Sequence, residues 1–128
     1  MKIISAQDHG QYSVEADESL MMALSKIDRN KLRCVFVVNK NRQLIGVLAD
    51  GDIRREILKG ISTSISVNEV SNRGVKFIIS NSATDLLGES QAIFESHPDI
   101  GVIPIVDEGM TLLSVVCKDL MTDMQKFT

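Results

Sequence analysis

Histidine and cysteine are the residue types best suited to metal binding or nucleophilic catalysis, and the chain has two of each. His9 and His97 lie far apart, and neither stands at metal-ligand spacing from Cys34 or Cys117. Both cysteines lie inside apolar stretches, so we expect buried thiols rather than a disulfide or an activated nucleophile. We expect His97, which precedes Pro98, to end a helix. The sequence therefore predicts no metal site, no catalytic residues and no enzymatic activity of this chain alone.

The second group of residues with chemical potential is charged, and its members lie close together: Asp50, Asp52, Arg54 and Arg55. Residues 1–62 carry 10 Lys and Arg against 8 Asp and Glu, whereas residues 63–128 carry 4 against 9. An anionic ligand is therefore expected in the first half. The alternative is structural, with Asp52 complementing a helix dipole and the two arginines on a solvated helix face.

The composition excludes several classes of protein. The chain has 128 residues, with 44% hydrophobic and 24% charged residues and a net charge of -3, which is typical of a globular domain. The apolar run Cys34–Val38 is far shorter than the ~20 residues that span a bilayer. No signal-peptide pattern begins the chain, so we expect a cytoplasmic protein. A pI near 5.3 and few aromatic residues exclude nucleic acid as an expected partner.

The positions of the charged group depend on a repeated strand–turn–strand pattern. β-branched apolar runs flank a polar turn at Val35–Asn39, Lys40–Gln43 and Leu44–Leu48. The same pattern returns 68 positions later, at Ile103–Asp107, Glu108–Thr111 and Leu112–Val116. This repetition predicts two hairpins in two copies of one unit.

A helix is expected before each hairpin, and an extended segment before each helix. In the first copy, Asp17 or Ser19 caps a helix with one apolar face: Leu20, Ala23, Leu24 and Ile27. In the second copy, Ser82–Asp85 has the spacing of a capping box, and an apolar face follows: Leu86, Leu87, Ile93 and Phe94. The expected extended segments are residues 12–14 and 75–79.

A short helix is also expected after each hairpin. Asp50 is the expected N-cap of the first, which runs to Lys59 and stops at Gly60, with three apolar residues facing inward: Ile53, Ile57 and Leu58. The second begins near Lys118, with its inward residues further along: Leu120, Met121 and Met124.

Together these elements predict an α/β (α+β) fold of two β-α-β-β-α repeats, residues 1–62 and 63–128, joined by the polar connector Ser62–Ser66. A unit of ~60 residues buries little surface alone. We therefore expect the two repeats to pack on each other with pseudo-twofold symmetry.

The segment Gly46–Arg55 resembles the signature of a CBS domain, a family named after cystathionine β-synthase. The resemblance extends over both repeats, which fits the tandem pairs known as Bateman modules. The sequence of the segment Asp50–Arg55 most resembles that of a CBS pair that precedes a sugar-phosphate nucleotidyltransferase domain in bacteria. This resemblance implies a regulatory domain, with a C-terminal transferase domain following in a longer protein; a small standalone protein is the alternative.

The resemblance further implies an adenine nucleotide (AMP, ADP or ATP) as regulatory ligand, bound in a cleft between the repeats, with no required cofactor. Asp52 would accept the ribose hydroxyls, since a carboxylate is a pure acceptor, and Arg54 or Arg55 would hold phosphate. Ala49 and Asp50 are the further implied ligand contacts at the helix start, and the strand residues Cys34, Val35 and Phe36 would face adenine. The implied contacts in the second repeat are Lys118 and Asp119.

Two departures from the family pattern favour an alternative function. Ala49 stands where the family has Thr or Ser, so a hydroxyl is missing. Cys117 of the second repeat corresponds to Ala49 at an offset of 68, but Asp119 corresponds to Asp52 at an offset of 67, so one residue is missing between the strand and the aspartate. The alternative is a ligand-free structural or dimerisation module with degenerate sites. Such modules form homodimers, and the expected contacts are methionines: Met21, Met22, Met121 and Met124.

Overall fold

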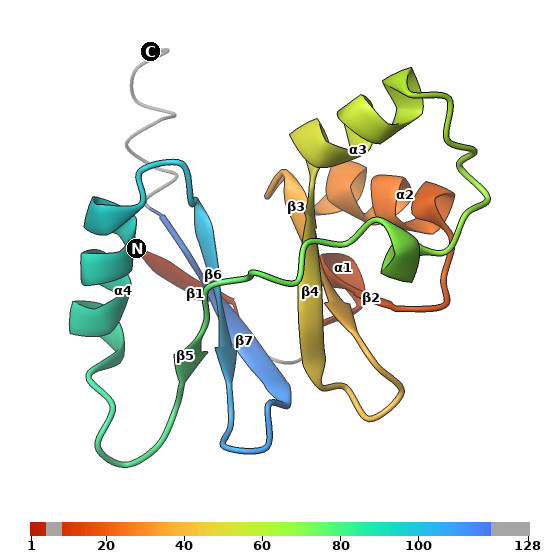
Figure 1. The fold of residues 1–128 in the computed structure, drawn as a ribbon. Helices are drawn as coiled ribbons and strands as arrows, with labels where there is room; N and C mark the ends of the chain where they lie inside the picture. Colours follow the sequence, from red (N-terminus) through yellow and green to blue (C-terminus); the bar gives the residue numbers. More distant parts are fainter. Residues whose placement is uncertain (5–8, 119–128) are drawn as a thin grey trace. The chain divides into compact units, whose positions relative to one another are not determined.

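The computed structural model describes residues 1–4 and 9–118 of the chain (Figure 1). The chain divides into two compact units, which we describe separately. The central unit is Gln7–Val75, and the terminal unit combines Met1–Ala6 with Lys76–Thr128. Within the described residues, no helix has the length and apolar character that a membrane span requires.

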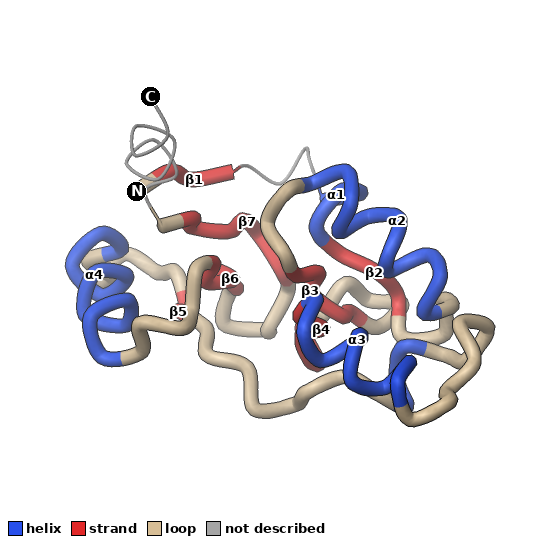
Figure 2. Tube along the Cα trace, turned by 90° about the horizontal axis from the view of Figure 1, so that it is seen from above, coloured by secondary structure: helices blue, strands red, loops and turns tan. Residues whose placement is uncertain are grey.

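The central unit is a three-stranded sheet with helices on one side. The strands β2 (Ser13–Glu15), β3 (Cys34–Val38) and β4 (Leu44–Ala49) lie in the order β2-β3-β4. β2 is parallel to β3, and β4 is antiparallel to it. The helices α1 (His9–Tyr12), α2 (Leu20–Asn30) and α3 (Asp50–Leu58) lie beside this sheet (Figure 2). The core gathers apolar residues from sheet and helices: Val14, Leu20, Ala23, Ile27, Val35, Val37, Leu48, Ile53 and Val67.

Helix α2 confirms the prediction from periodicity. Ser19 is its N-cap, and the Ser19 hydroxyl accepts a hydrogen bond from the backbone N–H of Met22. Leu20, Ala23 and Ile27 are buried, as their i, i+3 and i+7 spacing requires. The extended segment expected at residues 12–14 is shifted by one residue, because Tyr12 ends α1 and β2 begins at Ser13.

Helix α3 corrects two predictions. Its N-cap is Ala49 rather than Asp50, and no side chain caps it. Ile53 is buried as expected, but Ile57 is 40% and Leu58 81% exposed. Ile53, in the first turn, is therefore the residue that packs this helix into the core. The helix ends at Leu58 with Lys59 as its C-cap, and Gly60 follows as the expected stop: its φ of +92° is one that a residue without a side chain adopts readily.

The terminal unit is a four-stranded sheet that combines a strand near the N-terminus with three strands from the second half of the chain (Figure 1). The strands β1 (Lys2–Ile4), β5 (Ile78–Ile79), β6 (Val102–Val106) and β7 (Leu112–Cys117) lie in the order β1-β7-β6-β5. β1 was not predicted, and it pairs antiparallel with β7. β5 is shorter than the extended segment expected at residues 75–79. The core is again shared between sheet and helix: Ile78, Phe94, Ile103, Ile105 and Val116.

Helix α4 (Leu86–Ser96) has a different cap from the one predicted, but its apolar face packs as predicted at Leu86, Ile93 and Phe94. Asp85, not Ser82, is the N-cap, and its carboxylate accepts from the backbone N–H of Gly88. Leu87 is 56% exposed, whereas Ser90 and Phe94 are buried. One face of the helix packs against the sheet, and the polar residue Ser90 lies on that face.

The two hairpins repeat in detail at the offset of 68. In β3–β4 the register shifts between Val37 and Val38, and in β6–β7 it shifts between Ile105 and Val106. The turns match as well: the side chains of Asn39 and Asp107 each accept backbone N–H groups two and four residues later. The repeated hairpin sequence therefore encodes a repeated hairpin structure.

The division into compact units does not follow the sequence boundary at residues 62 and 63. Ile65 accepts a backbone hydrogen bond from Leu20 at 2.9 Å, and Asn72 pairs with Val47. The segment from 63 to 75 is therefore part of the central unit. As a boundary between repeats, residue 62 stays a prediction from sequence similarity.

Candidate ligand-binding site

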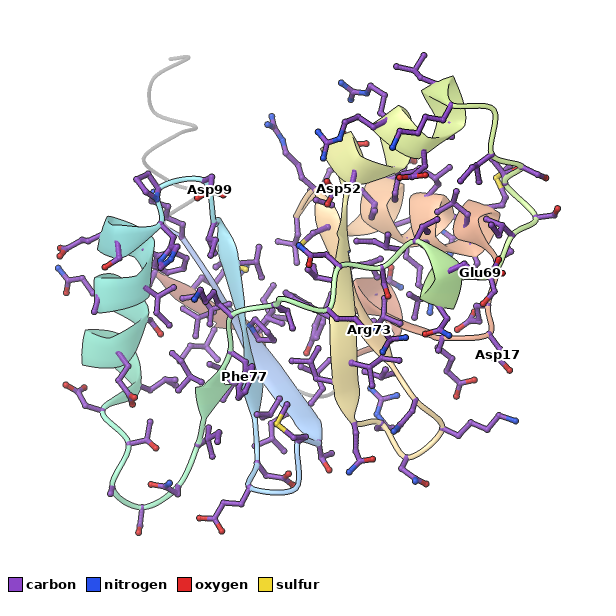
Figure 3. The ribbon with its side chains drawn as sticks, in the orientation of Figure 1. Asp17, Asp52, Glu69, Arg73, Phe77 and Asp99 are labelled. Carbon is purple, nitrogen blue, oxygen red and sulfur yellow. The ribbon has the colours of Figure 1, made fainter. Side chains whose placement is uncertain are left out.

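The end of the β3–β4 hairpin brings several predicted site residues together. Cys34 and Ala49 are cross-strand partners at this end. The backbone N–H of Asp50 donates to the carbonyl oxygen of Arg33 at 2.9 Å, which fixes the start of α3 against the start of β3. Asp52 follows in the first turn of α3, where Figure 3 shows it at the end of β4. The strand end thus positions the charged helix start.

The four charged residues of α3 form two ion pairs along the helix. Arg54 donates to Asp50 at 3.1 Å, and Arg55 donates to the Oδ1 atom of Asp52. The side chain of Asp52 is 35% exposed and that of Arg55 67%. The guanidinium of Arg55 folds back over the first turn, since a Cβ at Gly51 would lie 3.9 Å from its Nη1 atom.

A hollow of about 470 Å³ opens beside this helix start. Its lining comes from α2, the following turn and α3: Leu24, Ile27, Asp28, Lys31, Arg33 and Asp50. Lys31 and Arg33 were not among the predicted site residues, although the pairing of β3 with β4 brings Arg33 to the start of α3. The available signal was two basic residues directly before β3. Both have left-handed backbone conformations, with φ of 63° and 65°.

A second hollow of about 560 Å³ lies in the terminal unit and has a different character. Its lining residues come from β5 and the start of α4: Phe77, Ile78, Ile79, Asn81, Ala83, Thr84, Asp85 and Glu89. It contains two carboxylates and no cationic side chain, so it is unsuited to a phosphate. The hollow near Asp50 therefore remains the better candidate for an anionic ligand.

The residues predicted to lie against adenine differ in their burial. Val35 belongs to the core of the central unit and is fully buried. Phe36, on the other face of β3, is 1% exposed. Cys34 is half-buried, which corrects the expectation of a fully buried thiol at this position. Of the three, Cys34 alone presents side-chain surface beside Ala49.

The corresponding part of the second repeat is described up to Lys118. Val102 pairs with Cys117 as Cys34 pairs with Ala49, at the same offset of 68. The backbone N–H of Lys118 donates to Gly101 at 2.8 Å, which matches the Asp50–Arg33 bond. Lys118 is exposed. Asp119 lies outside the described residues, and so do Leu120, Met121 and Met124 of the predicted last helix.

Cys117 is fully buried, as predicted. Burial raises the pKa of its thiol, and the positive charge of Lys2 opposes this shift. The thiol is therefore held in its protonated, unreactive form. His97 caps the C-terminus of α4, which confirms the expected helix end. Among the residues that the structure describes, no three His, Cys, Asp or Glu side chains form a group suited to a metal ion.

The sequence matches the CBS domain family over residues 10–59. An uncharacterized protein of Helicobacter pylori (strain J99 / ATCC 700824) is 34% identical over 94 residues, which are 73% of this chain and 28% of that protein. Arabinose 5-phosphate isomerase GutQ of Escherichia coli (strain K12) is 30% identical over 102 residues, 77% of this chain and 29% of that protein. The chain thus spans less than a third of these relatives.

Solved structures show the same fold over nearly the whole chain. The crystal structure of CBSX2 in complex with AMP has a TM-score of 0.70 at 19% identity, and covers 98% of this chain and 95% of that one. The CbpB protein of Listeria monocytogenes in complex with c-di-AMP has a TM-score of 0.72 at 16% identity, and covers 98% and 92%. The α+β fold predicted from the sequence is therefore confirmed.

Proposed function

We propose that this chain, which has the fold of a CBS domain pair and matches the CBS domain over residues 10–59, is a regulatory module that binds an adenine nucleotide. The observation that carries this proposal is the charged start of α3. It pairs Asp52 with Arg55 and Asp50 with Arg54, and Asp50 lines a hollow that also contains Lys31 and Arg33. The complexes of similar fold with AMP and c-di-AMP support the same ligand class.

Each charged residue has a proposed part in binding. Asp52 accepts the two ribose hydroxyls, because an ionised carboxylate offers acceptors on both oxygens. Arg54 or Arg55 holds the phosphate oxygens in a bidentate fork. Lys31 and Arg33 add positive charge at the hollow, and Asp50 anchors Arg54. The adenine ring is proposed to contact the strand at Cys34, because the other two residues predicted for this contact, Val35 and Phe36, are buried.

A second binding position, with Lys118 and Asp119, is proposed on the repeat alone. The repeated hydrogen bond at Lys118 supports it. The missing residue between the strand and Asp119 opposes it, since one residue turns a helix position by about 100°. We therefore propose the first repeat as the principal site.

The module is proposed to control an attached or partner enzyme of sugar-phosphate metabolism. The sequence resemblance favours a sugar-phosphate nucleotidyltransferase. The similarity to arabinose 5-phosphate isomerase favours an isomerase domain instead, and both classes act on phosphorylated sugars. Sequencing the gene beyond the codon for Thr128 distinguishes the two classes. A phosphate-binding loop for a nucleotide in the following sequence favours the transferase, and its absence favours the isomerase.

The ligand-free alternative is favoured by Ala49, which lacks the hydroxyl of the family pattern. A structural module would form a homodimer without binding nucleotide. Met21 and Met22 are 55% and 43% exposed, which leaves them available for such a contact. Sedimentation over a range of protein concentrations, with and without AMP, separates this alternative from a nucleotide sensor.

Thermal unfolding with AMP, ADP and ATP tests the proposed function. At a nucleotide concentration a hundredfold above the dissociation constant, the free energy of unfolding should rise by about 2.7 kcal/mol. Asp52→Ala should abolish this rise and lower the ligand-free stability by about 1 kcal/mol or less, the contribution of a first-turn acid.

Asp17→Ala is the matched control, because Asp17 is an exposed aspartate at a distance from Asp52 within the same unit (Figure 3). It removes the same charge and should leave the nucleotide response intact. If no nucleotide stabilises the unmodified chain, the sensor proposal is wrong. If Asp52→Ala unfolds the chain, Asp52 has a structural role instead.

A further inference from the structure

The carboxylate proposed to bind ribose is already occupied by a neighbouring side chain. Arg55 donates from its Nη2 atom to Oδ1 of Asp52, one turn earlier on the same helix face. The neighbouring pair, Asp50 and Arg54, satisfies the other carboxylate at 3.1 Å. Each acidic residue of the α3 start therefore has its own arginine.

We infer that Arg55 competes with the sugar hydroxyls for Asp52, so that the module selects phosphorylated nucleosides over free nucleosides. This inference rests on the proposed function, in which Asp52 accepts the ribose. A free nucleoside must displace the guanidinium and offers it no new partner. A nucleotide carries a phosphate, to which the displaced guanidinium can donate instead.

The local structure allows Arg55 to exchange partners at little cost. Its side chain is 67% exposed, so its movement disturbs no core packing. Gly51 contributes no side chain to the first turn, and the guanidinium lies over this position, 3.9 Å from where a Cβ would stand. The side chain of Asp52 is 35% exposed and its Oδ1 atom is taken by Arg55, so two sugar hydroxyls that use both carboxylate oxygens must displace this contact.

Titration calorimetry with adenosine and AMP tests the inference on the full chain and on Arg55→Gln. The variant frees Asp52, and an exposed ion pair of this kind opposes binding by about two- to fivefold. Adenosine should therefore bind about two- to fivefold more tightly. AMP should bind at least about fivefold more weakly, because a charge-assisted hydrogen bond to phosphate is lost. The preference for AMP over adenosine should thus fall about tenfold or more.

Lys59→Gln is the matched control. Lys59 pairs with Glu56 at 3.5 Å near the other end of α3, so this variant removes the same charge and a comparable i, i+3 ion pair. It should leave the AMP preference unchanged. Circular dichroism melting of both variants verifies that the fold is retained.

Three outcomes separate the inference from the proposed function. Tighter adenosine binding together with weaker AMP binding in Arg55→Gln, and neither change in Lys59→Gln, supports competition. An unchanged or weaker adenosine affinity in Arg55→Gln, with AMP still bound by the unmodified chain, overturns the inference and leaves the proposed function standing. Absence of binding of both compounds to the unmodified chain overturns both.

The salt dependence of the unmodified chain gives a second, independent measurement. Salt screens the exposed Asp52–Arg55 pair and the attraction of phosphate. Competition therefore predicts that adenosine affinity rises with salt while AMP affinity falls. Adenosine carries no charge, so an affinity that stays constant or falls contradicts the competition.

Discussion

Ala49 affects both the stability of α3 and the chemistry of the proposed site. It has the extended backbone of an N-cap, with φ of -95° and ψ of 153°, but its methyl group accepts no hydrogen bond. Ser19 has the same role at α2, and there the side chain accepts from the N–H of Met22. The first turn of α3 thus lacks an acceptor that α2 has, and the site lacks a hydroxyl at the same position.

Ala49→Ser should therefore stabilise the chain by about 0.5–2 kcal/mol, the usual value of a serine N-cap relative to alanine. The added hydroxyl should also strengthen nucleotide binding. Chemical denaturation and AMP titration measure the two effects. Ala83→Ser, in an exposed turn outside the helices, should change neither. A variant less stable than the parent would mean that the half-buried position beside Cys34 has no room for the oxygen.

At the scale of elements, strand β4 depends on a close backbone approach at Gly46. The segment that follows α3 returns to pair with β4, and the N–H and C=O groups of Val47 bond to those of Asn72, each at 2.9 Å. A Cβ at Gly46 would stand 3.0 Å from the carbonyl oxygen of Asn72 and 3.1 Å from Oγ of Ser71. This approach keeps residues 63–75 in the central unit.

Gly46→Ala should destabilise the central unit by about 1–3 kcal/mol, the usual cost of adding a methyl group to a packed position. The same change at Gly51, within α3, should stabilise it by about 0.5–1 kcal/mol through helix propensity. A Cβ there meets only Nη1 of Arg55, at 3.9 Å. Urea unfolding of the two variants should give shifts of opposite sign. Equal shifts would mean that the Asn72 segment moves away at no cost.

At the scale of the whole molecule, the chain begins and ends in the same unit. β1 covers the edge of β7, with Lys2 opposite Cys117 and Ile4 opposite Val115. Cys117 is fully buried at this junction, and burial raises the pKa of its thiol. Because only the thiolate reacts, Cys117 should be modified in the folded protein only when the unit opens.

Removal of residues 1–4 should therefore accelerate the modification of Cys117 at least about tenfold, the equivalent of about 1.4 kcal/mol less protection. The experiment uses Cys34→Ser as background, because Cys34 is half-buried and reacts separately. Raising the pH above the ordinary cysteine range should also lower the stability of the unit, since the raised pKa of the folded state disfavours the thiolate. An unchanged rate after truncation would show that β1 does not protect β7.

The elements with local signals were predictable from the sequence. The hairpins repeat at a fixed offset, and the stripe of Leu20, Ala23 and Ile27 specifies α2. The cap of α4 and the exposed Leu58 were not predictable, since several polar residues can cap and several stripes can pack. β1 was missed because three residues carry no periodicity, and its partner strand lies more than a hundred residues away.

By itself the sequence determined the repeat, the α+β class and the charged segment from Asp50 to Arg55, because these depend on residue types at short spacing. Only the tertiary structure decided which side chains meet. It placed Lys31 and Arg33 beside the start of α3, and Val35 in the core. Contacts between distant segments follow from packing, which no local pattern records.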